Sequence, residues 1–263
     1  TYGADAMRWY LLSSSILRGS DFAVTEEGIR DTVRQVMLPL WNSWYFLSLY
    51  ANAEAKTGSI DYSSTNVLDV YIFSKLHKLV AETTKLMDSY DLFEACQQVR
   101  GFLDALTNWY IRRSRRRFWK TENDGDTQAA YATLYTCLVT LSKLLAPFMP
   151  FTTETVWRWW QNGSVHTATW PTTAELGPIG DSAILDPIGE ILSQVRRAKT
   201  DAKTSQKTAV TEATVSAPET VLTAFELGRG DLSDAGSVRS WVTVASAGET
   251  TVSAVLAPPE PAS

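Results

Sequence analysis

Residues 91–120 read DLFEACQQVRGFLDALTNWYIRRSRRRFWK, and this stretch decides the fold. Asp91 followed by Glu94 matches the pattern that begins a helix, in which side chains bind the free backbone N–H groups of the first turn. Apolar side chains then recur at intervals of three and four, at Leu92, Ala95, Val99, Phe102, Leu103, Leu106, Trp109 and Tyr110. This spacing predicts a long helix with one buried face.

Three other stretches have the same helical spacing and supply the surfaces that would cover this face. They occupy residues 29–51, 68–87 and 131–145. Thr25, which two glutamates follow, predicts the start of the first one, because acidic residues are favoured at a helix N-terminus. Pro39 predicts a kink within it. Four long helices with short connections predict a mainly α fold built on an antiparallel helix bundle.

The composition changes after the bundle. A segment rich in Thr, Pro and Gly reads as a boundary, and beyond it one helix, a strand at 209–216, a helix at 218–228 and two more strands are expected. The predicted division is a bundle at residues 25–163, a linker at 164–181, a small α+β domain at 182–257 and a disordered tail at 258–263.

The bulk composition limits the class of function. The 263 residues have a net charge of −5, so this is not a general polyanion binder and any contact with nucleic acid must be local. Two cysteines without a CxxC or Cys/His cluster speak against structural zinc and fit a reducing compartment. The sequence has no signal segment and no apolar stretch long enough to span a bilayer, which predicts a cytoplasmic location. The abrupt helical start without Met suggests a piece of a longer chain.

Against this acidic background, five arginines crowd into residues 112–117. Arg113 and Arg117 fall on the line that continues the apolar face, and a guanidinium is not buried without a partner. We therefore expect this end of the helix to project past the bundle core. The helix dipole and neighbouring acids such as Glu94 or Asp104 would account for one or two arginines. Five together repel one another unless an anion is present, and Arg is suited to phosphate.

Aromatic side chains are interleaved with these cations, as on surfaces that bind unstacked RNA bases. The candidate RNA-binding residues are Arg112, Arg113, Arg115, Arg116, Arg117, Lys120, Trp109 and Trp119. Trp109 adjoins the apolar stripe, which favours a packing role, whereas Trp119 fits either packing or stacking. Two alternatives fit the same residues. In the first alternative, the bundle is a helical module that binds a protein through its aromatic faces. In the second, the bundle is a rigid spacer, and the α+β domain does the binding.

Other conspicuous side chains point less clearly to a function. Two aromatic segments recur at helical spacing and are expected in the core, namely Trp41, Trp44, Tyr45, Phe46 and Trp157, Trp159, Trp160. His77 and His166 are isolated, and KTSQK at residues 203–207 lacks the glycine-rich cradle of a phosphate loop. There is no P-loop, GxSxG or HExxH motif. The sequence therefore predicts binding, with no catalytic residue, no metal and no cofactor in this chain.

The stretch LDALTNWYIRRSRRRFW at residues 103–119 resembles the anticodon-binding helical domain of class I aminoacyl-tRNA synthetases, and the isoleucyl-tRNA synthetase family in particular. Five more stretches are similar to that family: YGADAMRWYLLSSS (2–15), IRDTVRQVMLPLWNSWYFLSLYANA (29–53), YDLFEACQQVR (90–100), LLAPFMPFTTETVW (144–157) and SVHTATWP (164–171). Two later ones look more like valyl-tRNA synthetase: TETVWRWWQNGSVH (153–166) and VRRAKTDAKTSQKTAVT (195–211). The resemblance implies isoleucine as the amino acid, with valine as the alternative.

The resemblance also implies a division of labour. In this family a catalytic domain with HIGH and KMSKS motifs activates the amino acid with ATP and Mg²⁺, and the bundle receives the anticodon stem-loop of tRNA. Neither motif occurs here, so the chain would be a recognition fragment that is inactive alone. Its partners would be tRNA and the catalytic domain of the same enzyme, with no membrane contact. Residues 1–24 would be the end of the catalytic-core and stem-contact region.

Overall fold

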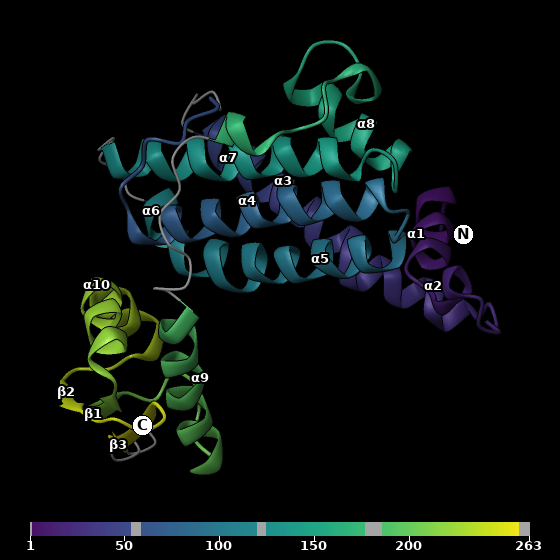
Figure 1. Ribbon diagram of the computed structural model, residues 1–263. Helices are drawn as coiled ribbons and strands as arrows, with labels where there is room; N and C mark the ends of the chain where they lie inside the picture. The colour runs from purple at the N-terminus through teal and green to yellow at the C-terminus, as the bar shows by residue number, and fades with distance from the viewer. Residues whose placement is uncertain (1, 54–58, 120–124, 177–185, 258–263) are drawn as a thin grey trace, which may run out of the picture. The chain divides into compact units, whose positions relative to one another are not determined.

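The chain folds as two compact units, Thr1–Gly180 and Asp181–Ser263. We call them the helical unit and the α+β unit. The computed structural model describes residues 2–53, 59–119, 125–176 and 186–257 (Figure 1). The predicted tail at 258–263 lies outside the described residues.

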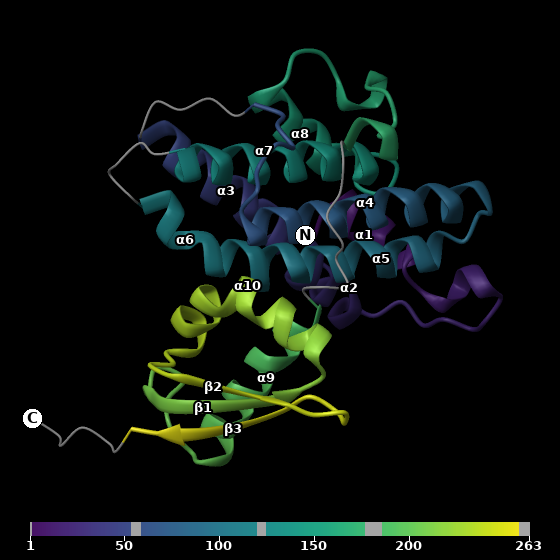
Figure 2. The same ribbon diagram turned by 60° about the vertical axis from the view of Figure 1, so that its left-hand side comes forward.

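The helical unit is built on long helices that lie alongside one another (Figures 1 and 2). They are α3 (Leu38–Ala53), α4 (Val67–Asp88), α5 (Leu92–Asp104) continued by η3 (Ala105–Ile111) and α6 (Arg112–Trp119), and α7 (Gly125–Leu145). Their apolar faces meet in one core, which contains Leu40, Ile72, Phe102 and Leu138. The prediction of a mainly α fold with a helix bundle is confirmed.

Two helices begin where capping side chains were predicted. The Thr25 hydroxyl accepts a hydrogen bond from the backbone N–H of Gly28 at 3.1 Å, at the start of α2 (Glu26–Thr32). The Asp91 carboxylate accepts one from the N–H of Glu94, also at 3.1 Å, at the start of α5. Each cap satisfies a backbone donor that has no partner within its own helix.

Two of the long helical segments contain a π-helical turn. The first, η2 (Val33–Met37), lies just before Pro39, where the sequence predicted an irregularity. The second is η3, between α5 and α6. A π-turn accommodates one extra residue and rotates everything that follows. After η3, the fully buried position on the apolar face of the long helix is therefore Ser114. Regular helical spacing would instead have buried Arg113.

The N-terminal segment belongs to the helical unit. In α1 (Ala4–Leu12), the Trp9 ring is fully buried and lies edge-on to Phe148, with centroids 5.8 Å apart. The Asp5 carboxylate accepts hydrogen bonds from the backbone N–H groups of Phe151 and Thr152, at 3.3 and 2.6 Å. These groups are in the first turn of α8 (Pro150–Trp160), so a residue of α1 caps α8.

The segment predicted as a linker is largely part of the bundle. Residues 165–176 contain two 3₁₀ turns, η4 (Val165–Thr167) and η5 (Thr173–Leu176), and their end residues Val165 and Leu176 are buried in the core. The Trp170 indole N–H donates to the Thr84 hydroxyl at 2.9 Å. Val165, Trp170 and Leu176 thus attach this polar stretch to the bundle, and the sequence analysis overlooked them. The prediction of a linker is therefore wrong for residues 165–176. Residues 177–181 lie outside the described part of the chain.

The α+β unit has a three-stranded sheet in the order β2-β1-β3 (Figure 2). Its elements are α9 (Asp186–Asp201), β1 (Val210–Ala217), α10 (Glu219–Gly236), β2 (Trp241–Ala245) and β3 (Thr251–Leu256). The pair β1–β2 is parallel and joined through α10, whereas β1–β3 is antiparallel. The predicted small α+β domain is confirmed, and α10 extends eight residues beyond the predicted helix end at 228.

Both cysteines are buried in the helical core. Burial raises the pKa of the Cys96 thiol to about 12, although the nearby charge of Arg100 acts to lower it. Burial also raises the pKa of the Cys137 thiol.

Within the described residues, no helix combines the length and the apolar character needed to cross a membrane.

These thiols give a pH-dependent prediction. Between the ordinary thiol pKa of 9.0 and about 12, the folded chain keeps a proton at Cys96 that the unfolded chain has lost. The free energy of unfolding should therefore fall as pH rises through this window. Urea unfolding at about pH 8 and about pH 10 measures the fall, and Cys96→Ala should show a smaller one. An equal fall in both proteins would contradict the assignment.

Candidate nucleic-acid interface

The arginine-rich end of the long helix does not project past the core, as the sequence had suggested. Phe118 in α6 is fully buried, with its ring 5.0 Å from those of both Phe46 and Tyr131. Arg117 is only 7% exposed. The helix end is therefore part of the bundle, and its arginines divide into buried and exposed ones.

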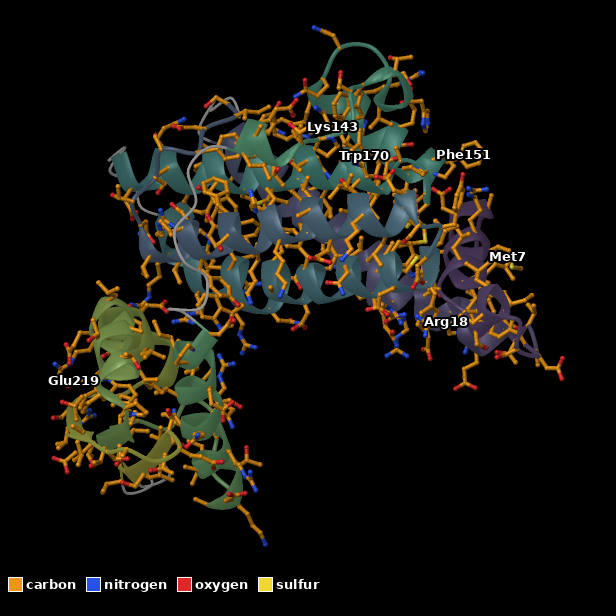
Figure 3. All side chains as sticks on the ribbon, viewed as in Figure 1. Met7, Arg18, Lys143, Phe151, Trp170 and Glu219 are labelled. Carbon is orange, nitrogen blue, oxygen red and sulfur yellow. The ribbon has the colours of Figure 1, made fainter. Side chains whose placement is uncertain are left out.

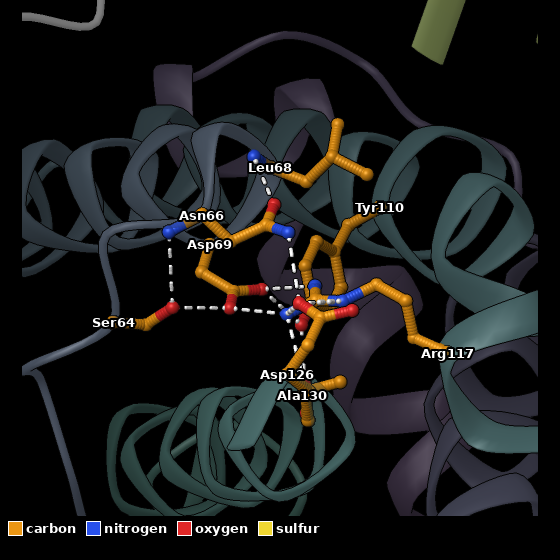
Figure 4. Close-up of polar contacts among 8 residues, drawn as sticks. All are labelled: Ser64, Asn66, Leu68, Asp69, Tyr110, Arg117, Asp126 and Ala130. Carbon is orange, nitrogen blue, oxygen red and sulfur yellow. Dashed lines mark hydrogen bonds and ion pairs between the residues drawn. The ribbon is translucent and has the colours of Figure 1, made fainter. Parts of the chain in front are cut away.

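Arg117 is neutralised inside the protein by two carboxylates (Figure 4). Its guanidinium donates to both oxygens of Asp69, at 2.7 and 2.8 Å, and its Nε donates to Asp126 at 2.9 Å. The Tyr110 hydroxyl donates to the same Asp69 carboxylate at 2.7 Å, and the Ser64 hydroxyl at 2.6 Å. Two guanidinium N–H groups on one carboxylate form the bidentate geometry of a strong ion pair.

This buried network joins three helices at favourable positions. Asp69 is in the first turn of α4 and Asp126 is in the first turn of α7, where the helix dipole favours negative charge. Arg117 is in the last turn of α6, where the dipole favours positive charge. Burial alone would lower the pKa of Arg117, but the hydrogen bond and charge of Asp69 raise it instead. Burial, with the Asp69 charge, raises the pKa of Tyr110.

Arg117 is therefore corrected from a predicted RNA contact to a structural residue. Its side chain faces Asp69, which is fully buried, and has no exposed face of the kind a phosphate would need. The sequence predicted that Arg117 continues the line of the buried apolar face, and the structure does bury it. What the sequence did not reveal is its partners, Asp69 and Asp126, which are 48 and 9 positions away from it.

Arg112, Arg115 and Arg116 are exposed, and we call them the arginine ridge. Within the described residues, no carboxylate pairs with Arg112 or Arg115. Their charges are therefore available at the surface. Lys120, the remaining predicted cation, lies outside the described residues.

Trp109 and Arg113 form a stacked pair beside the ridge. The Arg113 guanidinium carbon is 3.8 Å from the Trp109 ring centroid, and the Tyr71 ring centroid is 4.3 Å from the same ring. Such a cation–π contact stabilises a guanidinium that is partly withdrawn from water. Trp109 is half-buried and packs against the core, in agreement with the packing role that its position favoured.

Trp119 lies on the other flank of the ridge and is 56% exposed. Its indole N–H donates to the hydroxyl of Tyr50. Together with Arg115 it lines a groove of about 590 Å³ between α3 and the long helix, which we call the aromatic groove. Tyr45 and the amide side chains of Asn42 and Asn108 also line it. Aromatic faces, a cation and amide groups are the parts with which proteins hold an unstacked nucleobase.

The aromatic segments were predicted to be core, and this is only partly correct. Trp44 and Trp157 are buried, but Trp41, Tyr45 and Trp159 are 39%, 61% and 57% exposed. For Trp41 and Tyr45 the reason is that α3 has apolar side chains around most of its circumference, and a helix in a bundle buries only one side of it. A second stripe of Leu38, Trp41, Tyr45 and Leu49, separate from the buried one, was the overlooked sign in the sequence.

The remaining sequence candidates do not assemble into a site. Among the described residues, no group of three or more His, Cys, Asp or Glu side chains lies together as a metal site would. The KTSQK segment forms the turn after α9. The Lys199 ammonium ties this turn to the end of α10, because it donates to the backbone oxygens of Gln206 and Gly236 at 3.0 and 2.7 Å.

Comparison with known proteins gives a consistent result. The family described as "Anticodon-binding domain of tRNA ligase" matches residues 69–215, more than half of the chain. An isoleucine–tRNA ligase of Corynebacterium efficiens is 56% identical over 59% of the chain, and one of Leifsonia xyli subsp. xyli is 48% identical over 69%. One of Nocardia farcinica is 42% identical over 82% of the chain.

The chain spans only 14%, 16% and 20% of the length of these three relatives. The Nocardia alignment covers 82% of the chain, so wherever it begins it continues well past residue 153. Similarity to isoleucine–tRNA ligases thus extends into the region that looked more like the valyl enzyme.

The buried pair gives a stability prediction. Arg117→Met leaves the Asp69 carboxylate buried without its partner, which should cost about 3–5 kcal/mol of unfolding free energy. Adding Asp69→Leu should recover most of the loss, because an apolar pair can replace a buried ion pair at little cost. Urea unfolding measures both. The control is the exposed Arg112→Met, expected within about 0.5 kcal/mol of the parent chain. An equal effect of Arg117→Met and Arg112→Met would refute the role of the network.

Proposed function

We propose, because the chain belongs to the family of anticodon-binding domains of tRNA ligases, that its helical unit binds the anticodon stem-loop of a tRNA at the arginine ridge and the aromatic groove. One observation supports this most directly. Arg112 and Arg115 are exposed and have no carboxylate partner in the described structure, and Arg115 lines a groove with an exposed tryptophan.

The contacts would divide between backbone and base. The arginine ridge suits phosphates, because a guanidinium offers a planar pair of donors to two phosphate oxygens. The aromatic groove suits an unstacked base, with Trp119 or Tyr45 against its face and the Asn42 and Asn108 amides near its edge. Phosphate contacts give affinity and position, whereas base contacts give specificity.

The buried network would act on this binding indirectly. Arg117 fixes the rotation of α6 by its contacts with α4 and α7, and the ridge and Trp119 are on the same two turns of helix. Cations held on a fixed helix lose less conformational freedom on binding than cations on a mobile segment. Arg117 is thus a positioning residue for its exposed neighbours.

We further propose that the ligase containing this chain joins isoleucine to its tRNA. The three isoleucine–tRNA ligases that are 42–56% identical support this amino acid over valine. ATP and Mg²⁺ would bind in parts of the ligase that this chain does not span, so the chain alone would not aminoacylate tRNA. Charging assays with the full-length ligase, comparing isoleucine with valine, test the assignment, and preferential charging with valine would overturn it.

A second contact surface of the helical unit suits a protein. A groove of about 430 Å³ is lined by Met37, Leu38, Trp41 and Phe151, among others, and by no charged side chain. Phe151, which is 67% exposed, points away from the bundle (Figure 3). A polyanion gains nothing from such a surface, whereas an apolar protein surface does. We propose this groove as a contact with the catalytic domain of the same ligase.

The arginine ridge gives a salt-dependence prediction. Two phosphates neutralised by Arg112 and Arg115 should make log K fall with log[salt] at a slope of about −1.4 for a single-stranded loop. Arg112→Gln should reduce the magnitude of that slope by about 0.7. Arg30→Gln, which removes an exposed arginine elsewhere on the unit, should not change it. Filter binding of tRNA between low and physiological salt measures the slopes. A slope near zero would rule out the phosphate contacts.

The aromatic groove gives a prediction with a matched control. Trp119 and Trp159 are equally exposed, at 56% and 57%, but only Trp119 lines the groove beside Arg115. Trp119→Ala should weaken binding of the anticodon stem-loop by about 1–3 kcal/mol, the value of one stacked base. Trp159→Ala should leave it unchanged. Fluorescence anisotropy with a labelled stem-loop measures both, and equal losses would mean that no specific stacking site exists there.

A further inference from the structure

A pocket of about 310 Å³ lies between α3 and α8, and we call it the aromatic cage. It shares Tyr45 with the aromatic groove and Trp41 with the groove of Met37 and Phe151, which we call the apolar groove. The function proposed above uses those two grooves and leaves the pocket between them without a role. Its lining consists of four aromatic side chains, a hydroxyl and an amide: Trp41, Tyr45, Ser48, Asn52, Trp159 and Trp160.

The rings of the cage are held in a fixed arrangement. The Trp41 and Trp159 rings are 5.3 Å apart between centroids and their planes are at 69°, so a group in the corner between them can lie against both faces. Trp160 is supported by the core, because its ring packs on the buried Trp44 and on Tyr135, with centroids 5.7 Å away in each case. The aromatic faces are therefore in place before a ligand arrives.

The electrostatics of the cage favour a cation. The face of an aromatic ring carries negative partial charge, which attracts ammonium and guanidinium groups. The cage also lies at the C-terminal ends of two helices, because α3 ends at Ala53 and α8 ends at Trp160. A helix has the negative pole of its dipole at this end. Among the described residues that line the cage, none is charged.

The described structure supplies no cation of its own to these rings. Within the part of the chain that it covers, no lysine or arginine side chain lies over any of the four cage rings. Arg158, the basic residue in the last turn of α8, donates instead to the Glu154 carboxylate at 2.7 Å. The ring faces and the two helix ends are thus suited to a positive group from outside.

The neighbouring groove indicates where this cation comes from. The cage and the apolar groove have the Trp41 ring as a common wall, so a protein surface that fills the groove also reaches the cage. A phosphate is repelled by both the ring faces and the helix ends, which disfavours an RNA backbone. A protein that combines an apolar surface with one basic side chain fits both sites at once.

We propose that the aromatic cage binds the side chain of a lysine or arginine on the protein that covers the apolar groove. Its cationic group lies in the corner between Trp41 and Trp159, and the exposed Asn52 amide oxygen accepts a hydrogen bond from it. This inference rests on the protein contact proposed above and adds a charged anchor to it. Two apolar surfaces slide on one another at little cost, whereas a cation in a cage fixes one orientation.

The first test measures cation selectivity in this chain. Butylguanidinium reproduces the end of an arginine side chain, butylurea has a similar shape without the charge, and uridine represents an unstacked base. Each is titrated into the isotope-labelled chain, and the indole N–H signals of Trp41 and Trp159 are followed by NMR. Butylguanidinium should bind about five-fold more tightly than butylurea or uridine, because a cation–π contact requires the charge.

Matched variants separate the aromatic faces from the shape of the pocket. Trp159→Leu keeps an apolar side chain but removes a ring, so it should weaken butylguanidinium binding, followed at Trp41, about five-fold. Trp159→Phe should retain most of the affinity. Tyr90→Leu, which removes an exposed ring outside the cage, should have no effect. Because Trp159 is 57% exposed, its variants should unfold at the parent temperature.

Two results of this test would overturn the inference. Equal affinity for butylguanidinium and butylurea would make the pocket an apolar one, and tighter binding of uridine would make it a base site. Unchanged butylguanidinium binding in Trp159→Leu would likewise remove the cage from the contact.

The second test uses the full-length ligase and separates this inference from the contact on which it rests. Hydroxyl-radical footprinting compares the oxidation of Phe151 in the apolar groove and Trp159 in the cage between the ligase and the chain alone. Both should be protected in the ligase. Protection of Phe151 without protection of Trp159 would overturn the cage and leave the groove contact standing. Equal oxidation of both residues in both proteins would overturn the two proposals together.

Discussion

The helical unit depends on the ion pair between Arg117 and Asp69. A charged side chain removed from water is stable only with a partner of good geometry, and here the bidentate contact, Asp126 and the Tyr110 hydroxyl together supply it. The pair fixes how α6 is rotated and how it is placed against α4 and α7. The surface that follows from this placement, with three arginines outward and Phe118 inward, is set by one buried contact.

Arginines that are neighbours in sequence therefore have different physical roles. Arg117 is enclosed by carboxylates, Arg113 lies on an aromatic ring, and Arg112 and Arg115 face solvent. The mutual repulsion of five guanidinium groups is reduced because one is neutralised internally. It is not abolished, since no carboxylate pairs with Arg112 or Arg115 among the described residues. The electrostatic argument for an anionic ligand thus survives, but it applies to fewer residues than the sequence suggested.

Most of the fold followed from local rules, and most errors came from long-range contacts. The caps at Thr25 and Asp91 act between residues three apart, so they were predictable from the sequence. The partner of Arg117 is 48 residues away, and no spacing rule finds it. Trp41 is in α3, which has apolar side chains around most of its circumference, so its exposure depends on which side of α3 the other helices cover. The aromatic groove is lined by two segments of the chain, α3 and the long helix, so no single stretch of sequence predicts it.

The π-turn η3 has a consequence for insertions and deletions. It holds one residue more than a regular helix would need, and each residue of an α-helix turns the chain by about 100°. A family member shorter by one residue in 105–111 would keep every downstream side chain but present it in another direction. Arg117 would leave Asp69, and Trp119 would leave the aromatic groove. Length at this point is thus under the same structural constraint as the identity of the charged residues themselves.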